Sequence, residues 1–274
     1  MKNFHGRFVL VTGAGSGIGR ETSLAFAREG ARLALADIDA AAGEETAALV
    51  RRGGAQASVH PVDVGDAAAM ERLVAVVRDE AGVPDIVVNN AGIGVAGSLL
   101  NTSLSDWERV VHVNLWGVIH GCRLFAPLMV ERRRGGHIVN IASAAAFAPS
   151  RVLPAYSTTK AAVLMLSECW RIELAEHGIG VTVICPGIID TNIVRTTQWV
   201  GLNVEEARSR RDRAVRLYRR RNYGPERVAA RILAAVRRNR AVVPVTPEAH
   251  ALRLAARLLP GTVRSLARNS SLGT

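Results

Sequence analysis

Short apolar runs and amphipathic segments alternate along the first 190 residues of this chain. Each apolar run is rich in Val, Ile, Leu or Ala and is bounded by turn-forming residues, which is typical of a strand buried on both faces. The segments between them repeat apolar residues every three or four positions, as amphipathic helices do. This alternation predicts an α/β fold with a doubly wound parallel sheet and helices on both faces. The predicted strands are 8–12, 31–37, 57–63, 85–91, 136–142 and 180–186, and the predicted helices are 18–29, 40–52, 66–81, 104–133 and 154–177.

The chain shows no internal repeat, low-complexity tract or Pro/Gly/Ser-rich linker, so residues 1–274 are predicted to form a single domain. The strand–helix rhythm changes after Thr191. From there the patterns predict an arginine-rich helix at 204–221, a helix near 225–238, a short strand in AVVPV at 241–245, and an amphipathic piece at 248–259.

Basic charge is concentrated in the last third of the chain. The formal net charge is +11, and residues 195–274 hold eighteen arginines against five acidic residues. An arginine-rich solvated surface accounts for this excess. The alternative is a basic tail that meets anionic lipid, an acidic substrate or another protein. Aromatic residues make up only 4% of the chain and no nucleic-acid motif is present, so we do not expect nucleic-acid binding.

Compartment and metal content are also constrained by the sequence. No apolar run reaches the ~18 residues of a membrane-spanning helix, and we expect no secretory leader. The widely spaced Cys122, Cys169 and Cys185 predict reduced, buried thiols. The histidines lack metal-ligand spacing. We therefore expect a cytoplasmic protein without a metal, with peripheral contact between the basic tail and a membrane as the alternative.

A glycine-rich turn, TGAGSGIG at 12–19, joins the first predicted strand to the first predicted helix. Its glycines allow a tight turn that brings bare backbone and a helix N-terminus against a diphosphate. Asp37 ends the second strand, where a carboxylate accepts hydrogen bonds from adenosine ribose hydroxyls and repels a 2′-phosphate. Ser16 and Ile38 bring no positive charge there. These features predict a Rossmann fold that binds NAD(H) rather than NADP(H).

Tyr156 and Lys160 lie four residues apart in a predicted helix and share one of its faces. Tyrosine ordinarily titrates near ~10, and an adjacent ammonium favours the phenolate. Tyr-x-x-x-Lys is common on helix surfaces, but Lys160 is one of only two lysines among 35 basic residues. Arginine therefore does not suit this position. The pair predicts an acid/base tyrosine whose pKa is lowered by a neighbouring cation.

Over essentially its whole length the chain resembles the short-chain dehydrogenases/reductases, which implies an NAD(H)-dependent oxidoreductase. The matching elements are TGAGSGIG at 12–19, Asp37, Asp63-Val64, NNAG at 89–92, Asn114, Ser143, YSTTK at 156–160, and Pro186-Gly187 followed by Thr191. The resemblance implies the catalytic residues Asn114, Ser143, Tyr156 and Lys160. It implies cofactor contacts at Gly13, Ser16, Gly17, Ile18, Gly19, Asp37, Asp63, Val64, Asn90, Ala91, Gly92, Tyr156, Lys160, Pro186, Gly187, Ile189 and Thr191.

The same resemblance assigns individual roles and a division of the chain. Asp63 and Val64 contact adenine, Asn114 kinks a long helix and holds a water of the proton relay, Ser143 hydrogen-bonds the substrate oxygen, Tyr156 transfers the proton, Lys160 holds the nicotinamide ribose, and Thr191 anchors the carboxamide. The implied division is a core at 1–191, a substrate loop at 192–222 and a C-terminal helix, strand and basic tail at 223–274. The loop and tail also resemble dehydrogenase modules fused behind an epoxide-hydrolase domain in actinobacterial proteins, in VNLWGVIHGCRLF, ICPGIIDTNI, LYRRRNYGPE and RAVVPVTPEA.

The substrate side of the sequence is apolar. It predicts a bulky apolar secondary alcohol or ketone, such as a steroid, a terpenoid or a long-chain acyl compound. The predicted substrate contacts are Ser143, Ala145, Phe147, Tyr156, Ile193 and Trp199. Two alternative functions stay open: a catalytically silent nicotinamide-binding regulator and a membrane-surface interaction protein.

Two helical faces bear on assembly. The helices at 104–133 and 154–177 resemble those that pair between subunits in this family. We expect a homotetramer, or else a dimer, with apolar faces that include Val110, Val113, Leu166 and Trp170. In the tail, Leu252, Ala255, Ala256 and Leu259 share one helical face, which we expect to cover the substrate cleft. The alternative is an interfacial helix on an anionic membrane.

Overall fold

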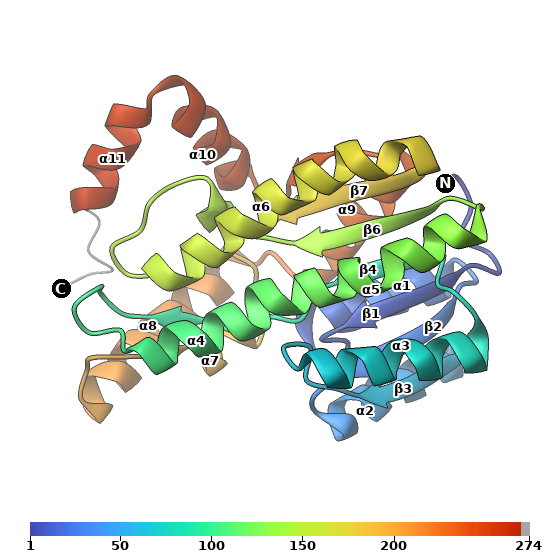
Figure 1. The fold of residues 1–274 in the computed structure, drawn as a ribbon. Helices are drawn as coiled ribbons and strands as arrows, with labels where there is room; N and C mark the ends of the chain where they lie inside the picture. The colour runs from blue at the N-terminus through green and yellow to red at the C-terminus, as the bar shows by residue number, and fades with distance from the viewer. Residues whose placement is uncertain (270–274) are drawn as a thin grey trace.

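A seven-stranded sheet runs through the molecule with helices on both of its faces (Figure 1). The structure is a computed structural model and describes residues 1–269. In spatial order the strands are β3 (Ala57–Pro61), β2 (Arg32–Asp37), β1 (Phe8–Thr12), β4 (Ile86–Asn89), β6 (Gly136–Ile141), β7 (Ile179–Cys185) and β9 (Val242–Pro244), and all neighbours are parallel. The strand order reverses direction between β1 and β4, where open α/β sheets bind ligands. The predicted single-domain, doubly wound α/β Rossmann fold is confirmed.

Two hydrophobic cores, one on each face, hold helices to the sheet. Because successive strand residues point to opposite faces, Leu10 of β1 joins one core while Val9 and Val11 join the other. A strand buried on both faces must therefore be apolar throughout, which is the pattern seen in the sequence. The first core packs beneath α3 (Ala67–Ala81), α5 (Gly117–Arg132) and α6 (Pro154–Leu174), and the second beneath α1 (Gly17–Arg28), α2 (Ala40–Arg52) and α9 (Pro225–Arg237).

Smaller elements gather at the end of the molecule away from the N-terminus (Figure 1). The elements in this region are β5 (Val95–Ala96), α4 (Leu104–Val111), a 3₁₀ turn (Ala144–Ala146), α7 (Ile193–Thr196), β8 (Gln198–Trp199), α8 (Val204–Arg221), α10 (Pro247–Leu258) and α11 (Pro260–Asn269). The short strands β5 and β8 pair with each other in parallel. A second 3₁₀ turn (Ala175–His177) follows α6.

The predicted helix at 104–133 consists of α4, a π turn (His112–Trp116) and α5. By length and composition alone the stretch Leu104–Arg132 qualifies as a membrane-crossing helix. Many of its apolar residues, however, pack inside the protein, where Val110, Phe125 and Met129 are completely buried. The stretch is therefore a core helix of this fold.

Several expectations need correction. Cys169 is exposed, whereas Cys122 and Cys185 are buried. Val110 is completely buried within its own subunit, and the half-buried Val113 packs against the core and lines the cavity described below, so neither forms an outer face. The sequence patterns also predicted neither α11 nor the β5–β8 pair. Residues 270–274 of the predicted tail lie outside the described residues.

Candidate active site

A cavity of about 660 Å³ lies at the carboxyl ends of the central strands. This is the edge at which parallel α/β sheets hold their ligands. Most of the predicted site residues line it: Gly13, Ser16, Gly17, Ile18, Asp37, Asp63, Val64, Asn90, Ala91, Gly92, Ser143, Ala145, Tyr156, Lys160, Pro186, Gly187, Ile189, Thr191, Ile193 and Trp199. Gly19, Asn114 and Phe147 lie outside this lining.

The glycine-rich turn after β1 is held by the loop that follows β4. The Thr12 hydroxyl oxygen accepts the backbone N–H groups of Asn90 and Ala91 at 3.0 and 3.1 Å, and the Asn90 amide donates to the carbonyls of Thr12 and Gly13. A Cβ at Gly19 would stand 2.0 Å from the Gly13 carbonyl oxygen, so only glycine lets α1 approach this closely. Gly19 thus does not line the cavity but allows α1 to pack closely against the turn. The N-terminus of α1 presents its unpaired N–H groups to the cavity.

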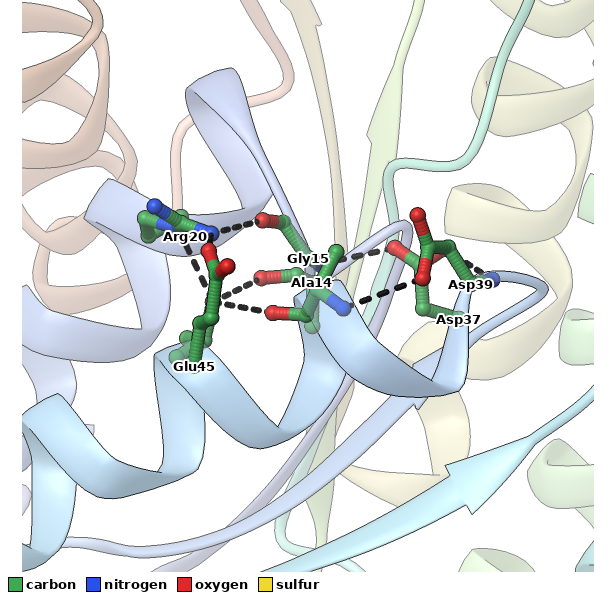
Figure 2. Close-up of polar contacts among 8 residues, drawn as sticks. Ala14, Gly15, Arg20, Asp37, Asp39 and Glu45 are labelled. Carbon is green, nitrogen blue, oxygen red and sulfur yellow. Dashed lines mark hydrogen bonds and ion pairs between the residues drawn. The ribbon is translucent and has the colours of Figure 1, made fainter.

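Asp37 lies at the far end of the cavity from Tyr156, beside the turn. Its Oδ2 accepts the Gly15 N–H at 2.7 Å and its Oδ1 accepts the Asp39 N–H at 2.9 Å. Arg20 lies on the other side of the turn, where its guanidinium donates to the Gly15 carbonyl at 2.6 Å and pairs with Glu45 at 2.9 Å (Figure 2). Because a carboxylate accepts up to about four hydrogen bonds, Asp37 keeps acceptor capacity toward the cavity. The Arg20 charge is directed at α2 instead.

Asp63 and Val64 line the cavity just after β3, and neighbouring groups fix both. Asp63 Oδ1 accepts the Gly65 N–H at 2.9 Å. The Val64 carbonyl lies 2.9 Å from Nδ1 of the buried His120. This part of the wall is therefore preorganised rather than a free loop.

Tyr156 and Lys160 project from the first turns of α6 into the cavity. Lys160 Nζ donates to the Ile141 carbonyl at 2.9 Å and lies 5.7 Å from the centroid of the Tyr156 ring. Ser143 follows β6, and its hydroxyl accepts the Ala145 N–H at 3.1 Å. One wall of the cavity thus presents a hydroxyl, a phenol and an ammonium group.

Asn114 lies in the π turn between α4 and α5, where the resemblance implied a kink. Its Oδ1 accepts the Ile93 N–H at 2.8 Å and its Nδ2 donates to the Ile93 carbonyl at 3.0 Å. A Cβ at Gly92 would lie 3.2 Å from Asn114 Oδ1 and 3.4 Å from Lys160 Nζ, so both polar groups face this glycine. The buried Asn114 therefore fixes the segment that borders Lys160.

Comparison with known proteins identifies the family. Residues 7–199 match the family described as short chain dehydrogenase. The chain belongs to this family. Membership confirms the predicted oxidoreductase class.

Individual relatives of this short-chain dehydrogenase agree with that assignment. The probable oxidoreductase EphD of Mycobacterium tuberculosis is 51% identical over 267 residues, 97% of this chain. Those residues cover 45% of EphD, so the chain spans about half the length of that relative. SadH of the same species, described as an oxidoreductase, is 33% identical over 269 residues, which cover 97% of this chain and 95% of SadH.

Solved structures show the same family over the full length of the fold. A short-chain dehydrogenase/reductase from Burkholderia phymatum, crystallised in complex with NAD, is 30% identical with a TM-score of 0.86 and 99% coverage of both chains. Levodione reductase is 29% identical with a TM-score of 0.79, covering 92% of this chain and 100% of the other.

Tyr156, predicted as the acid/base residue, differs from expectation in its ionisation. Burial raises the pKa of Tyr156 to about 12, and the nearby Ser143 hydroxyl acts in the opposite direction. Burial also lowers the pKa of Lys160 to about 8. The predicted lowering of the tyrosine pKa is thus not seen, because burial disfavours the phenolate and the Lys160 ammonium is directed at the Ile141 carbonyl.

The far wall of the cavity comes from α8 and α10, and of its residues the sequence had indicated only Leu252. Ala214, Leu217 and Tyr218 of α8 line it together with Leu252 and Glu248 of α10. The three α8 residues are spaced i, i+3, i+4 in an otherwise charged helix, a signal from which they could have been found. The position of Leu252 in this wall supports the expectation that α10 covers the cleft.

Phe147, Trp199 and Glu248 bear on how the predicted substrate side is built. Phe147, predicted as a substrate contact, packs against the core instead, because the 3₁₀ turn after Ser143 directs it inward. Trp199 does border the cavity, and the pairing of β8 with β5 holds it there. Glu248 accepts the Ile188 N–H at 3.2 Å and forms an ion pair with Arg221, which joins α10 to the loop after β7 and to the end of α8.

Proposed function

We propose that this short-chain dehydrogenase transfers a hydride between NAD(H) and a bulky, apolar secondary alcohol or ketone. One observation carries the proposal: a single cavity joins the glycine-rich turn and Asp37 at one end to Ser143, Tyr156 and Lys160 at the other. The NAD complex of the Burkholderia phymatum relative supports the choice of cofactor.

The residues around the cavity fit NAD. The glycine-rich turn and the N-terminus of α1 suit a diphosphate, and the acceptor capacity of Asp37 suits the two ribose hydroxyls. Neither Ser16 nor Ile38 offers a cation for a 2′-phosphate, and Arg20 is engaged elsewhere. The remaining proposed contacts are Gly13, Gly17, Ile18 and Gly19 at the diphosphate, Asp63 and Val64 at the adenine, and Asn90, Ala91, Gly92, Lys160, Pro186, Gly187, Ile189 and Thr191 toward the nicotinamide.

The proposed chemistry divides between cofactor and protein. When bound, nicotinamide supplies the acceptor or donor of the hydride. Tyr156 takes the hydroxyl proton as the phenolate when the alcohol is oxidised, and as the phenol it gives its proton to the ketone oxygen in the reverse direction. Because burial raises its pKa, the phenolate needs the neighbouring Lys160 cation and a path by which the phenol proton leaves. Ser143 donates a hydrogen bond to the substrate oxygen, and Lys160 supplies the cation beside Tyr156. Asn114 holds, through Ile93, the segment that borders Lys160, and we assign it the water of the proton relay.

The substrate walls favour a large apolar molecule with a second polar group. Ala145, Ile193, Trp199, Leu217 and Leu252 are the apolar residues around the reacting groups. Tyr218 adds a further hydroxyl, close enough to Tyr156 to raise the pKa of that residue. No group among residues 1–269 is hydrogen-bonded to the Tyr218 hydroxyl, which leaves it available to a substrate oxygen. Steroids, terpenoid alcohols and long-chain acyl compounds share these features.

We propose an oligomer on the basis of exposed apolar residues on α6 and on the π turn between α4 and α5. Met165 and Ile172 of α6 are 62% and 81% exposed, and Trp116 of the π turn is 49% exposed. Their apolar surface fits a symmetric subunit contact. We propose a homotetramer in the cytoplasm, with a dimer as the alternative.

The test is a screen for NAD⁺ reduction, followed by NADH absorbance, across short alcohols, long-chain alcohols, hydroxysteroids and terpenoid alcohols. With the best substrate, Tyr156→Phe should lower turnover by ~10²–10⁴-fold, because only the proton-transfer group is lost. The affinity for NADH should stay nearly unchanged. Activity of Tyr156→Phe within about tenfold of the parent contradicts the mechanism. NADH binding without turnover of any alcohol favours the silent-regulator alternative.

A further inference from the structure

Exposed leucines gather at the end of the molecule that carries the substrate side of the cavity. We call Leu99, Leu100, Leu104, Leu254, Leu258 and Leu266 the apolar end face; their exposed fractions lie between 60% and 93%. A cluster of large apolar side chains in water marks a contact surface.

Hydrogen bonds bring the two halves of this face together. Arg151 donates to the Arg268 carbonyl at 2.8 Å, which ties α11 to the segment before α6. The next residue, Val152, accepts the Gly97 N–H at 2.8 Å, at the start of the loop that carries Leu99 and Leu100. The beginning of α4, α10 and α11 lie at the same end of the ribbon (Figure 1).

The charge of this end is mainly positive, because Asp106 and Glu108 of α4 are outnumbered by arginines. Residues 249–274 contain Arg253, Arg257, Arg264 and Arg268 and no acidic residue. Within residues 1–269 no ion pair joins these arginines to a carboxylate. The neighbouring α8 adds eight arginines against three acidic residues. In α10 and α11 the exposed leucines are flanked by arginines and, from residue 249 on, by no acidic residue, which is the composition of an interfacial helix on anionic lipid.

We propose that the apolar end face docks on an anionic membrane, with its leucines at the acyl boundary and its arginines among the headgroups. Helix α10 has two faces suited to this: Leu252 lines the cavity on the inner side, while Leu254 and Leu258 are exposed on the outer side. A helix that lines the cavity then lies next to the phase in which apolar molecules dissolve. Docking itself does not depend on the proposed catalytic function.

A second copy of the chain fits this face less well. In a twofold pairing the same patch meets itself, so a surface of net positive charge would face another of the same charge. An anionic surface neutralises this charge. Charge complementarity therefore selects the membrane as the partner.

Vesicle flotation tests the proposal on the intact protein, with phosphatidylcholine alone and with phosphatidylcholine mixed with phosphatidylglycerol. We expect binding only to the anionic vesicles at about 0.1 M salt and its loss towards about 1 M. Since each arginine near such a surface contributes roughly a fivefold factor, the triple variant R257Q/R264Q/R268Q should bind on the order of a hundredfold more weakly. The matched control R28Q/R52Q/R72Q removes the same charge from exposed positions on α1, α2 and α3 and should bind like the parent.

A leucine variant and light scattering separate docking from other causes. L254S/L258S changes two exposed side chains, and it should also weaken vesicle binding while leaving the oligomeric state unchanged. The proposal is overturned by absence of binding at low salt, by equal weakening in both arginine triples, or by unchanged binding of L254S/L258S. If the parent protein does not bind vesicles and L254S/L258S has a lower mass than the parent in light scattering, the face is a contact between copies of the chain. Vesicle binding is measured without turnover, so an inactive protein that binds vesicles contradicts the proposed function alone.

Discussion

Replacing Asp37 with asparagine tests how the structure selects its cofactor. The asparagine side chain keeps a carbonyl oxygen for the Gly15 N–H, which Oδ2 of the aspartate accepts at 2.7 Å in the parent protein. It loses the negative charge that faces a 2′-phosphate. Arg20 does not compensate in either protein, because it is held by Glu45 and the Gly15 carbonyl on the other side of the turn (Figure 2).

The expected magnitude follows from charge and exposure. Two unit charges about 4 Å apart repel by ~4 kcal/mol at an effective dielectric constant of ~20. Asp37 is half-buried, and solvent screening should reduce this to ~2.7 kcal/mol, a preference of ~10² for NAD over NADP in kcat/KM. Asp37→Asn should bring the preference below about tenfold. Catalysis with NAD itself should fall only ~5-fold, since a charge-assisted hydrogen bond becomes a neutral one.

The assay compares kcat/KM for NAD⁺ and NADP⁺ with one alcohol, together with the dissociation constants of NADH and NADPH by fluorescence titration. Asp39→Asn is the matched control: it removes the same charge two residues away and retains a side chain that can cap α2. Its cofactor preference should match that of the parent. An unchanged preference in Asp37→Asn, or an equal change in Asp39→Asn, would refute the reasoning.

Three further outcomes are expected. Burial lowers the pKa of Lys160 in the folded protein to about 8 from an ordinary ~10.4, so between these values the unfolded chain binds more protons than the folded one. The free energy of unfolding of the cofactor-free protein should therefore rise between pH ~8 and ~10, by up to roughly 3 kcal/mol. Lys160→Met should flatten that rise in denaturant titrations. Tyr218→Phe should raise KM by ~3–10-fold for substrates with a second oxygen without changing kcat, the cost of one hydrogen bond, and unchanged KM values across all such substrates argue against its role. Met165→Asp with Ile172→Asp should lower the mass measured by light scattering, and a monomeric parent protein contradicts the proposed assembly.

Local patterns identified the parts of the fold that are built from local sequence. The β1 strand, the turn after it and α1 follow each other within 8–28, and the spacing of the glycines is set by a clash that glycine alone avoids. Asp37 was identifiable because it ends the next strand along the chain. The carboxyl ends of parallel strands meet at one edge, so the order of strands and turns was enough to locate the site.

The missing features depend on packing between segments distant in sequence. Tyr218 reaches the cavity only because α8 folds back over it; the spacing of its apolar residues marks a buried face but does not say against which part of the protein that face packs. The β5–β8 pair is too short for a strand pattern. Helix α11 begins with Pro260 and Gly261, which also end helices, so the amphipathic pattern appeared complete before them. Phe147 was misplaced because an apolar residue after Ser143 fits a cavity wall and a core equally well.

The arginine-rich composition and the single buried lysine have one physical explanation. Lys160 is 3% exposed, its Nζ has the Ile141 carbonyl at 2.9 Å, and a Cβ at Gly92 would lie 3.4 Å from that nitrogen. A guanidinium is larger, carries five N–H donors in a fixed plane and keeps its proton above pH ~12. In this space most of those donors would be unpaired, and the charge could not be neutralised. An ammonium group with a pKa of about 8 is compact and can lose its proton when its partners are absent, which lets the fold keep a cation beside Tyr156 without a permanent buried charge. The same argument explains why the other 33 of the 35 basic residues can be arginine, with Lys2 near the exposed start of the chain as the remaining lysine.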